Sequence, residues 1–270
     1  MNIYQSLRQK LGRPLFSPFT VLGDPDLATS KQILQTLIDH GADALELGFP
    51  FSDPPADGPV IQAAHKRALQ SRITTADCFD LLAHIRTLDP AIPIGLLLYY
   101  NLIQQYGLEK FYASCQQYRV SSILIADLPL EHFSEVAPLS QKYQIPHVHI
   151  VSELTTDERL QQILATNPAY LYLVSYLGVT GNQTDKPGTT SDTPPASSTQ
   201  ATIARIRQHG SDVPIMVGFG ISSPSAAKNA ITEGADGFLV GSRLVREIAD
   251  PSTTIQNLKS LTTQFHDATK

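Results

Sequence analysis

Long hydrophobic runs and clusters of basic residues are both absent from this 270-residue sequence. The longest strongly apolar run, Ile94 to Tyr100, is far shorter than the roughly 20 residues that a membrane-spanning helix needs. The net charge is -5, and no Lys/Arg-rich segment offers a basic stripe to a polyanion. We therefore expect no membrane and no nucleic acid as a partner, and small molecules instead.

Cysteine is scarce, and the amino terminus has no secretory pattern. Cys78 and Cys115 are isolated in the sequence, so we expect small buried hydrophobic residues rather than a disulfide or a nucleophile. Residues 1–6 lack the basic start and apolar stretch of a signal peptide, which predicts a cytoplasmic protein. Hydrophobic residues make up 42% of the chain, enough for the core of one large α/β domain or two small ones.

Short apolar runs alternate with stretches of helical period along the whole chain. The runs do not alternate in polarity, which is typical of parallel strands buried on both faces. The predicted strands are Phe16 to Leu22, Ala44 to Leu47, Ile94 to Leu98, Ile123 to Ala126, His147 to Val151, Leu171 to Val174, Ile215 to Val217 and Phe238 to Val240. The clearest predicted helices are Leu27 to Asp39, Asp77 to Leu88, Leu108 to Tyr118, Thr156 to Ala165 and Thr202 to Gln208.

Eight such units in about 250 residues predict a single α/β domain over residues 1–270, a closed (β/α)8 barrel. An extra helix, Asn2 to Lys10, is expected to cap its bottom. An open doubly wound sheet ranks second, because no Gly-x-Gly-x-x-Gly follows the first strand. Two segments depart from this regular pattern. Residues 50–59 form a proline-rich loop, and residues 176–199, rich in Thr, Ser, Pro and Gly, are expected to form a lid over the active site.

The second predicted strand carries an acidic residue, Glu46, between two leucines. Burial there raises the pKa of a carboxyl group toward neutrality, where it both gives and takes protons. A structural ion pair, or a misjudged helix with Glu46 in water, is an equally weighted alternative. Asp53 and Asp57 follow on the proline-rich loop; each taken alone is more typical of a turn, but the pair supplies carboxylates for separate donor and acceptor roles.

Two glycine pairs end the last two strands. Gly218-Phe219-Gly220 follows the seventh strand, and Gly241-Ser242 follows the eighth, where a helix, Arg243 to Ile248, begins. The loops after these two strands are the places where (β/α)8 barrels bind phosphate, so we predict a phosphate site there. Gly178-Val179-Thr180-Gly181 is a third candidate segment for the same site. The alternative is that these glycines only form turns and that Ser242 is an ordinary N-cap.

Other polar residues on strands are weaker candidates. His147 and His149 share one face, but a third metal ligand is missing, so we predict no metal there. Tyr172 is a candidate pocket wall.

Taken together, the motifs resemble the α subunit of tryptophan synthase, a TIM-barrel family. The resemblance covers nearly the whole chain in order and rests on Pro18-Phe19, Leu22-Gly23-Asp24-Pro25, Leu45-Glu46-Leu47-Gly48, Pro50-Phe51-Ser52-Asp53-Pro54, Ala56-Asp57-Gly58-Pro59, Ile94-Gly95-Leu96-Leu97 with Tyr99 and Asn101, Ala126-Asp127-Leu128-Pro129, Gly178-Val179-Thr180-Gly181, Gly218-Phe219-Gly220-Ile221 and Gly241-Ser242.

This resemblance implies a lyase that splits indole-3-glycerol phosphate into indole and glyceraldehyde 3-phosphate, without metal or organic cofactor. Glu46 matches the family's acid/base, and Asp57 matches the carboxylate that binds the indole N–H. The matching positions for substrate binding are Phe19, Tyr172, Thr180, Gly181, Phe219, Gly220, Gly241 and Ser242. The implied partner is a pyridoxal-phosphate β subunit in an αββα assembly, which the loop 50–59 is expected to contact.

The sequence also departs from the family pattern. Tyr176, Leu177 and Asn182 alter the lid, Pro55 alters the partner loop, and Ser152-Glu153-Leu154 replaces a proline-containing turn. Two other functions therefore stay open at this stage. One is a weakly active α-like scaffold that mainly activates a β subunit, and the other is a barrel acting on another sugar phosphate.

Overall fold

A computed structural model of the chain describes residues 2–174, 197–249 and 255–270. Parallel strands alternate with helices along these residues, and each strand overlaps one of the eight predicted runs. The strands are β1 (Leu15–Val21), β2 (Leu45–Gly48), β3 (Ile94–Leu98), β4 (Ser122–Ile125), β5 (His149–Val151), β6 (Leu171–Val174), β7 (Ile215–Gly218) and β8 (Gly237–Val240). Only β5 is clearly shorter than expected.

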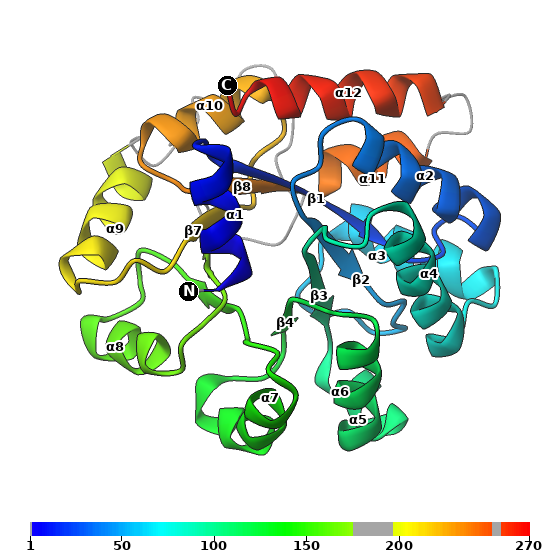
Figure 1. Cartoon of the computed structure of the whole chain (residues 1–270), viewed down its shortest axis with the longest axis horizontal. Helices are drawn as coiled ribbons and strands as arrows, with labels where there is room; N and C mark the ends of the chain where they lie inside the picture. The colour runs from blue at the N-terminus through cyan, green and yellow to red at the C-terminus, as the bar shows by residue number, and fades with distance from the viewer. Residues whose placement is uncertain (1, 175–196, 250–254) are drawn as a thin grey trace.

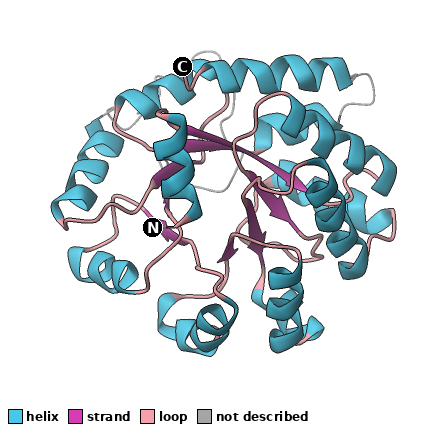
Figure 2. Cartoon of the chain, viewed as in Figure 1, coloured by secondary structure: helices cyan, strands magenta, loops and turns pink. Residues whose placement is uncertain are grey.

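The strands form a ring with helices around it (Figure 2). Their order is β4-β3-β2-β1-β8-β7-β6-β5, and all their pairings are parallel. The two end strands meet through an isolated parallel bridge between Ile123 of β4 and His147, two residues before β5. This bridge completes the ring, so the fold is the predicted (β/α)8 barrel rather than an open doubly wound sheet.

Helices cover the outside of the ring, and several of them begin at a residue whose side chain accepts a hydrogen bond from the first turn. They are α1 (Ile3–Leu11), α2 (Leu27–Asp39), α3 (Pro59–Gln70), α4 (Thr75–Leu88), α5 (Tyr100–Tyr106), α6 (Leu108–Gln117), α7 (Ala137–Tyr143), α8 (Asp157–Ala165), α9 (Ser197–Gln208), α10 (Pro224–Thr232), α11 (Ser242–Ala249) and α12 (Ile255–Asp267), with a 3-10 helix at Leu130–Glu135. A capping box of Thr74 and Asp77 starts α4 two residues before the predicted start. Of the helices that are described, none has the length and apolar character to cross a membrane.

Helix α1 closes the amino-terminal end of the barrel, as predicted. Figure 1 shows it lying across the middle of the strand ring. The buried ring of Tyr4 packs edge-on against Tyr170 with centroids 5.0 Å apart, and its hydroxyl is 2.7 Å from that of Ser122 at the start of β4. Arg8 pairs with Asp236, just before β8, at 3.0 Å. The strands end at the opposite side of the barrel, which is where (β/α)8 barrels place their active sites.

The barrel has an outer and an inner apolar layer. In the outer layer, Phe16 of β1 stacks on both Phe238 of β8 and Phe265 of α12. The inner layer includes Leu15, Leu124, Val148, Met216 and Leu239 from five different strands or the residues just before them. Cys78 and Cys115 are unpaired and buried, so the prediction of small buried residues is confirmed. Because both layers are filled, any polar group inside the barrel lies in an apolar environment.

Candidate active site

Glu46 lies in the middle of β2 and points into the barrel. It is opposite Phe19 of β1 and Gly95 of β3, and only 2% of its surface is exposed. The hydroxyl of Tyr170, a member of the inner layer, donates a hydrogen bond to its Oε1 at 3.0 Å. The structure thus favours the site interpretation of Glu46 over an ion pair or an exposed helix position.

The surroundings of Glu46 keep its carboxyl group protonated at neutral pH. The pKa of Glu46 is raised from 4.5 to about 8: burial is the largest cause, the hydrogen bond from Tyr170 opposes the rise, and the negative charge of Asp57 adds to it. A carboxyl group with a pKa near the working pH both donates and accepts a proton readily. Glu46 therefore has the properties of a general acid that then serves as a base.

The two loop carboxylates lie in different environments. Asp57 is buried: the hydroxyl of Tyr99 donates to its Oδ2 at 2.7 Å, and Nε2 of His65 is 3.2 Å from the same oxygen. Asp53 is exposed and accepts a hydrogen bond from the hydroxyl of Ser52 at 2.6 Å. Only Asp57 is close enough to Glu46 to affect its pKa. The structure brings together Glu46 and Asp57 and leaves Asp53 at the surface.

Phe19 and Tyr172 form apolar walls at the open end of the barrel. A Cβ atom added to Gly48 would lie 3.1 Å from the Phe19 ring, and one added to Gly241 would lie 3.5 Å from it. Phe19 thus spans from the strand of Glu46 to the end of β8. Tyr172 packs edge-on against Phe219 with centroids 5.9 Å apart. A flat aromatic group fits between such walls.

The glycine segments after β7 and β8 have the backbone geometry of an anion site. Phe219 and Gly220 are consecutive residues with positive φ, 63° and 80°, so the chain turns directly after β7. Helix α11 begins at Ser242, one residue before the predicted start, so Ser242 is its first residue and not its N-cap. The first N–H groups of a helix lack partners within it, and their dipoles favour a negative charge.

Three residues of the site were not identified from the sequence: Tyr170, Tyr99 and His65. Tyr170 contacts Glu46, which lies 124 residues away in the sequence. Tyr99 and His65 contact Asp57, from 42 and 8 residues away. The alternation of side chains along a strand could have identified Tyr170, because it lies two residues before Tyr172 and therefore shares its face. No local pattern distinguished His65 from any other helical residue.

Some predicted residues lie outside the described part of the chain. These are Thr180 and Gly181 of the substrate site, together with Tyr176, Leu177 and Asn182 of the lid. The lid prediction ended at residue 199, but α9 begins at Ser197, so its last three residues are helical. That end of the prediction was wrong because Thr and Ser-rich composition was taken for a loop.

His147 and His149 face outward, away from Glu46. Both rings contact the edge or face of Phe133 at 5.1 Å, and the hydroxyl of Tyr112 is 2.7 Å from Nε2 of His147. Burial lowers the pKa of His147 to about 3 and that of His149 to about 4, so both are neutral. Within the described ranges no three His, Cys, Asp or Glu side chains gather to hold a metal ion.

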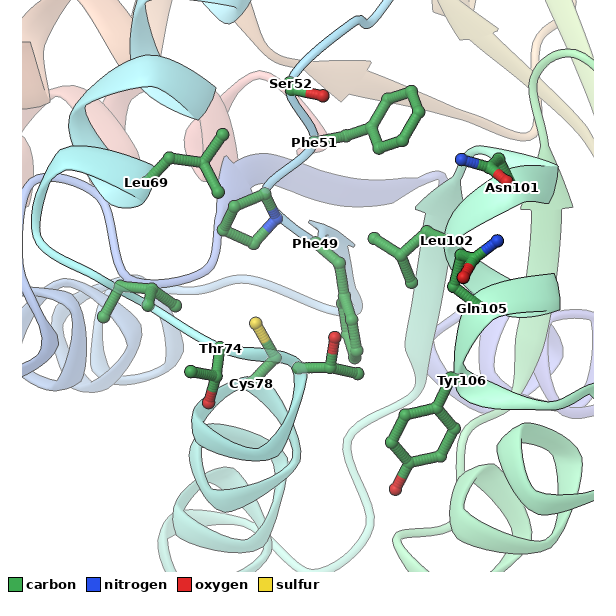
Figure 3. A pocket seen from close by; sticks show the side chains of 13 residues that line it. Phe49, Phe51, Ser52, Leu69, Thr74, Cys78, Asn101, Leu102, Gln105 and Tyr106 are labelled. Atoms are coloured by element: carbon green, nitrogen blue, oxygen red, sulfur yellow. The ribbon is translucent and has the colours of Figure 1, made fainter.

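A cavity of about 480 Å³ opens on the outer side of the proline-rich loop. Leu69 and Thr74 line one side of it, and Asn101 and Gln105 of α5 line the other, as Figure 3 shows. The ring of Phe51 lies at its edge and stacks on Tyr99, with centroids 5.0 Å apart. Because Tyr99 binds Asp57, this cavity is one side chain removed from the buried carboxylate.

The geometry defines a class of protein: a (β/α)8 barrel with two buried carboxyl groups close enough to influence each other. The chain belongs to the tryptophan synthase alpha chain family, whose model matches residues 5–270.

Relatives and solved structures agree with this assignment. The tryptophan synthase alpha chain of Vibrio cholerae is 41% identical over the full length of both chains. That of Methanothermobacter thermautotrophicus is 44% identical over 87% of this chain and 83% of its own. The tryptophan synthase subunit alpha of Legionella pneumophila is 31% identical, covers 99% of this chain and 98% of its own, and superposes with a TM-score of 0.84.

Proposed function

We propose that this chain carries out the reaction of its family, the cleavage of indole-3-glycerol phosphate, with Glu46 and Asp57 as its catalytic residues. The observation that carries the proposal is the buried, protonated carboxyl group of Glu46 inside the barrel, beside the carboxylate of Asp57. The reaction is a step of tryptophan biosynthesis, and we place it in the cytoplasm.

Glu46 first gives its proton to the indole ring carbon that bears the glycerol phosphate chain. The indole nitrogen then carries positive charge, which the carboxylate of Asp57 stabilises while it accepts the N–H. The newly formed carboxylate of Glu46 takes the proton of the adjacent side-chain hydroxyl. The carbon–carbon bond breaks, its electron pair returns to the ring, and the products are indole and an aldehyde, glyceraldehyde 3-phosphate.

The substrate's two ends suit the two halves of the open barrel end. The indole ring lies between Phe19 and Tyr172 in this proposal, above the carboxyl group of Glu46. The phosphate lies against the Phe219-Gly220 turn and the start of α11 at Gly241 and Ser242, where the helix dipole favours a negative charge. Thr180 and Gly181 complete the binding site.

The partner of the chain is a tryptophan synthase β subunit in an αββα assembly, and we propose that residues 50–59 contact it. The loop has one side toward the barrel, at Asp57, and the other toward the outer cavity, at Phe51 and Ser52. A partner bound at this cavity contacts Phe51, which stacks on Tyr99, and Tyr99 in turn donates a hydrogen bond to Asp57.

Release of indole from indole-3-glycerol phosphate by the isolated chain tests the proposal. We expect Glu46→Gln and Asp57→Asn each to lose at least about 10² to 10⁴ in kcat, the usual contribution of a positioned acid or base. Glu158→Gln on α8 and Asp80→Asn on α4 make the same two replacements at exposed positions and serve as controls. Undiminished turnover by the Glu46 variant would remove the mechanism.

A further inference from the structure

His65 lies on α3 in direct contact with Asp57. Only 2% of its surface is exposed, and a Cβ atom added to Gly48 would lie 3.7 Å from its Cε1. Its Nε2 is 3.2 Å from Oδ2 of Asp57. It is therefore behind the carboxylate, between α3 and the end of β2.

The hydrogen bonds of His65 define which ring nitrogen carries the proton. The backbone N–H of Phe51 donates to Nδ1 of His65 at 3.2 Å. An accepting Nδ1 has no proton, so the proton of the neutral ring is on Nε2. Nε2–H then donates to Asp57, and His65 connects the backbone at one end of the loop to the carboxylate at the other.

Within the part of the chain that the structure describes, two hydrogen bonds reach the Asp57 carboxylate, and both fall on one oxygen. Oδ2 accepts from Nε2–H of His65 on α3 and from the hydroxyl of Tyr99 at the end of β3. Neither residue binds Oδ1. Two donors from two different elements fix the rotation of the carboxylate plane and direct Oδ1 away from them.

From this geometry we infer that His65 is a positioning residue: it holds Oδ2 of Asp57 so that Oδ1 is presented to the indole N–H. The inference rests on the proposed role of Asp57. His65 is too deeply buried to reach substrate itself, so it acts only through Asp57. Its loss therefore affects the step in which positive charge forms on the indole ring, and kcat falls more than KM rises.

Three substitutions separate the two hydrogen bonds of His65. His65→Ala removes both. His65→Gln places an amide N–H near the position of Nε2 and keeps a donor to Asp57. His65→Asn places its amide near the position of Nδ1, where it binds the loop backbone but is too short to reach Oδ2. Lys66→Ala changes the next residue of the same helix, which is exposed, and is the matched control.

Steady-state release of indole from indole-3-glycerol phosphate is measured for all four variants. We expect kcat to fall on the order of 10- to 100-fold for His65→Ala and His65→Asn, with little change in KM. His65→Gln is expected to recover most of kcat, and Lys66→Ala to match the wild type. If His65→Ala fails to fold, the comparison of Gln with Asn still decides.

Equal kcat for the Gln and Asn variants, or wild-type kcat for His65→Ala, overturns the inference. Asp57→Asn is measured beside them to separate this result from a failure of the proposed function. Failure of the wild type to release indole refutes the proposed function itself, and an Asp57→Asn variant with wild-type kcat refutes the catalytic role of Asp57. An inactive one, together with equal Gln and Asn variants at position 65, refutes only the positioning role.

Discussion

The buried carboxyl group of Glu46 makes the stability of the protein depend on pH in a way that one substitution removes. The pKa of Glu46 is about 8 in the fold and 4.5 in its usual environment. Below pH 4.5 the group is neutral in both the folded and the unfolded chain and costs nothing. As the pH rises toward 8, only the unfolded chain ionises, and the wild type loses stability.

The size of this loss follows from the gap between the two pKa values. The gap is about 3.5 pKa units, and each unit corresponds to about 1.4 kcal/mol, so the full loss is on the order of 5 kcal/mol. Most of it builds up between pH 5.5 and pH 9. Glu46→Gln keeps the shape and cannot ionise, so its free energy of unfolding should gain about 3 kcal/mol on the wild type over that range.

Urea unfolding of wild type and Glu46→Gln at several pH values between 5 and 9 measures this difference directly. Glu158→Gln is the control, because its side chain is exposed on α8 and its effect should not vary over this range. A difference between Glu46→Gln and wild type that stays constant from pH 5.5 to pH 9 would refute the raised pKa and, with it, the acid role of Glu46.

Three further substitutions test the glycine segments and a buried ion pair. A Cβ atom at Gly218 would lie 2.1 Å from the Tyr172 ring, whereas one at Gly241 meets Phe19 only at 3.5 Å. Overpacking in Gly218→Ala should therefore lower the free energy of unfolding by about 1–3 kcal/mol, measured by thermal unfolding. Gly241→Ala should fold normally but raise KM for the phosphorylated substrate. A larger loss of stability in Gly241→Ala than in Gly218→Ala would contradict the packing argument. Arg67 binds both carboxylate oxygens of the fully buried Asp24 at 2.7 Å, so Arg67→Ala should lower the unfolding free energy by about 3–5 kcal/mol, and a loss below 1 kcal/mol would show that Asp24 is hydrated.

The architecture could be predicted from the sequence because the residues that specify each strand or helix lie within a few positions of one another. The bounds of β3, β6 and α2 are those expected from the sequence, and the capping pairs explain small shifts such as that of α4. Helices α3 and α10 were missed although a proline at their first turn marks each start. Their helical period is comparable to that of α2, so the sequence carried the signal for both helices.

The amino-acid sequence by itself determined the eight-unit barrel, the two carboxylates and the glycines at the strand ends, because spacing and residue type decide these locally. It left Glu46 equally balanced between a site and an ion pair. The burial and the raised pKa of Glu46 come only from the tertiary structure, since they depend on the closed ring and on residues such as Tyr170, 124 positions away. The same holds for Asp57, which became distinct from Asp53 only when Tyr99 and His65 were brought to it by separate elements.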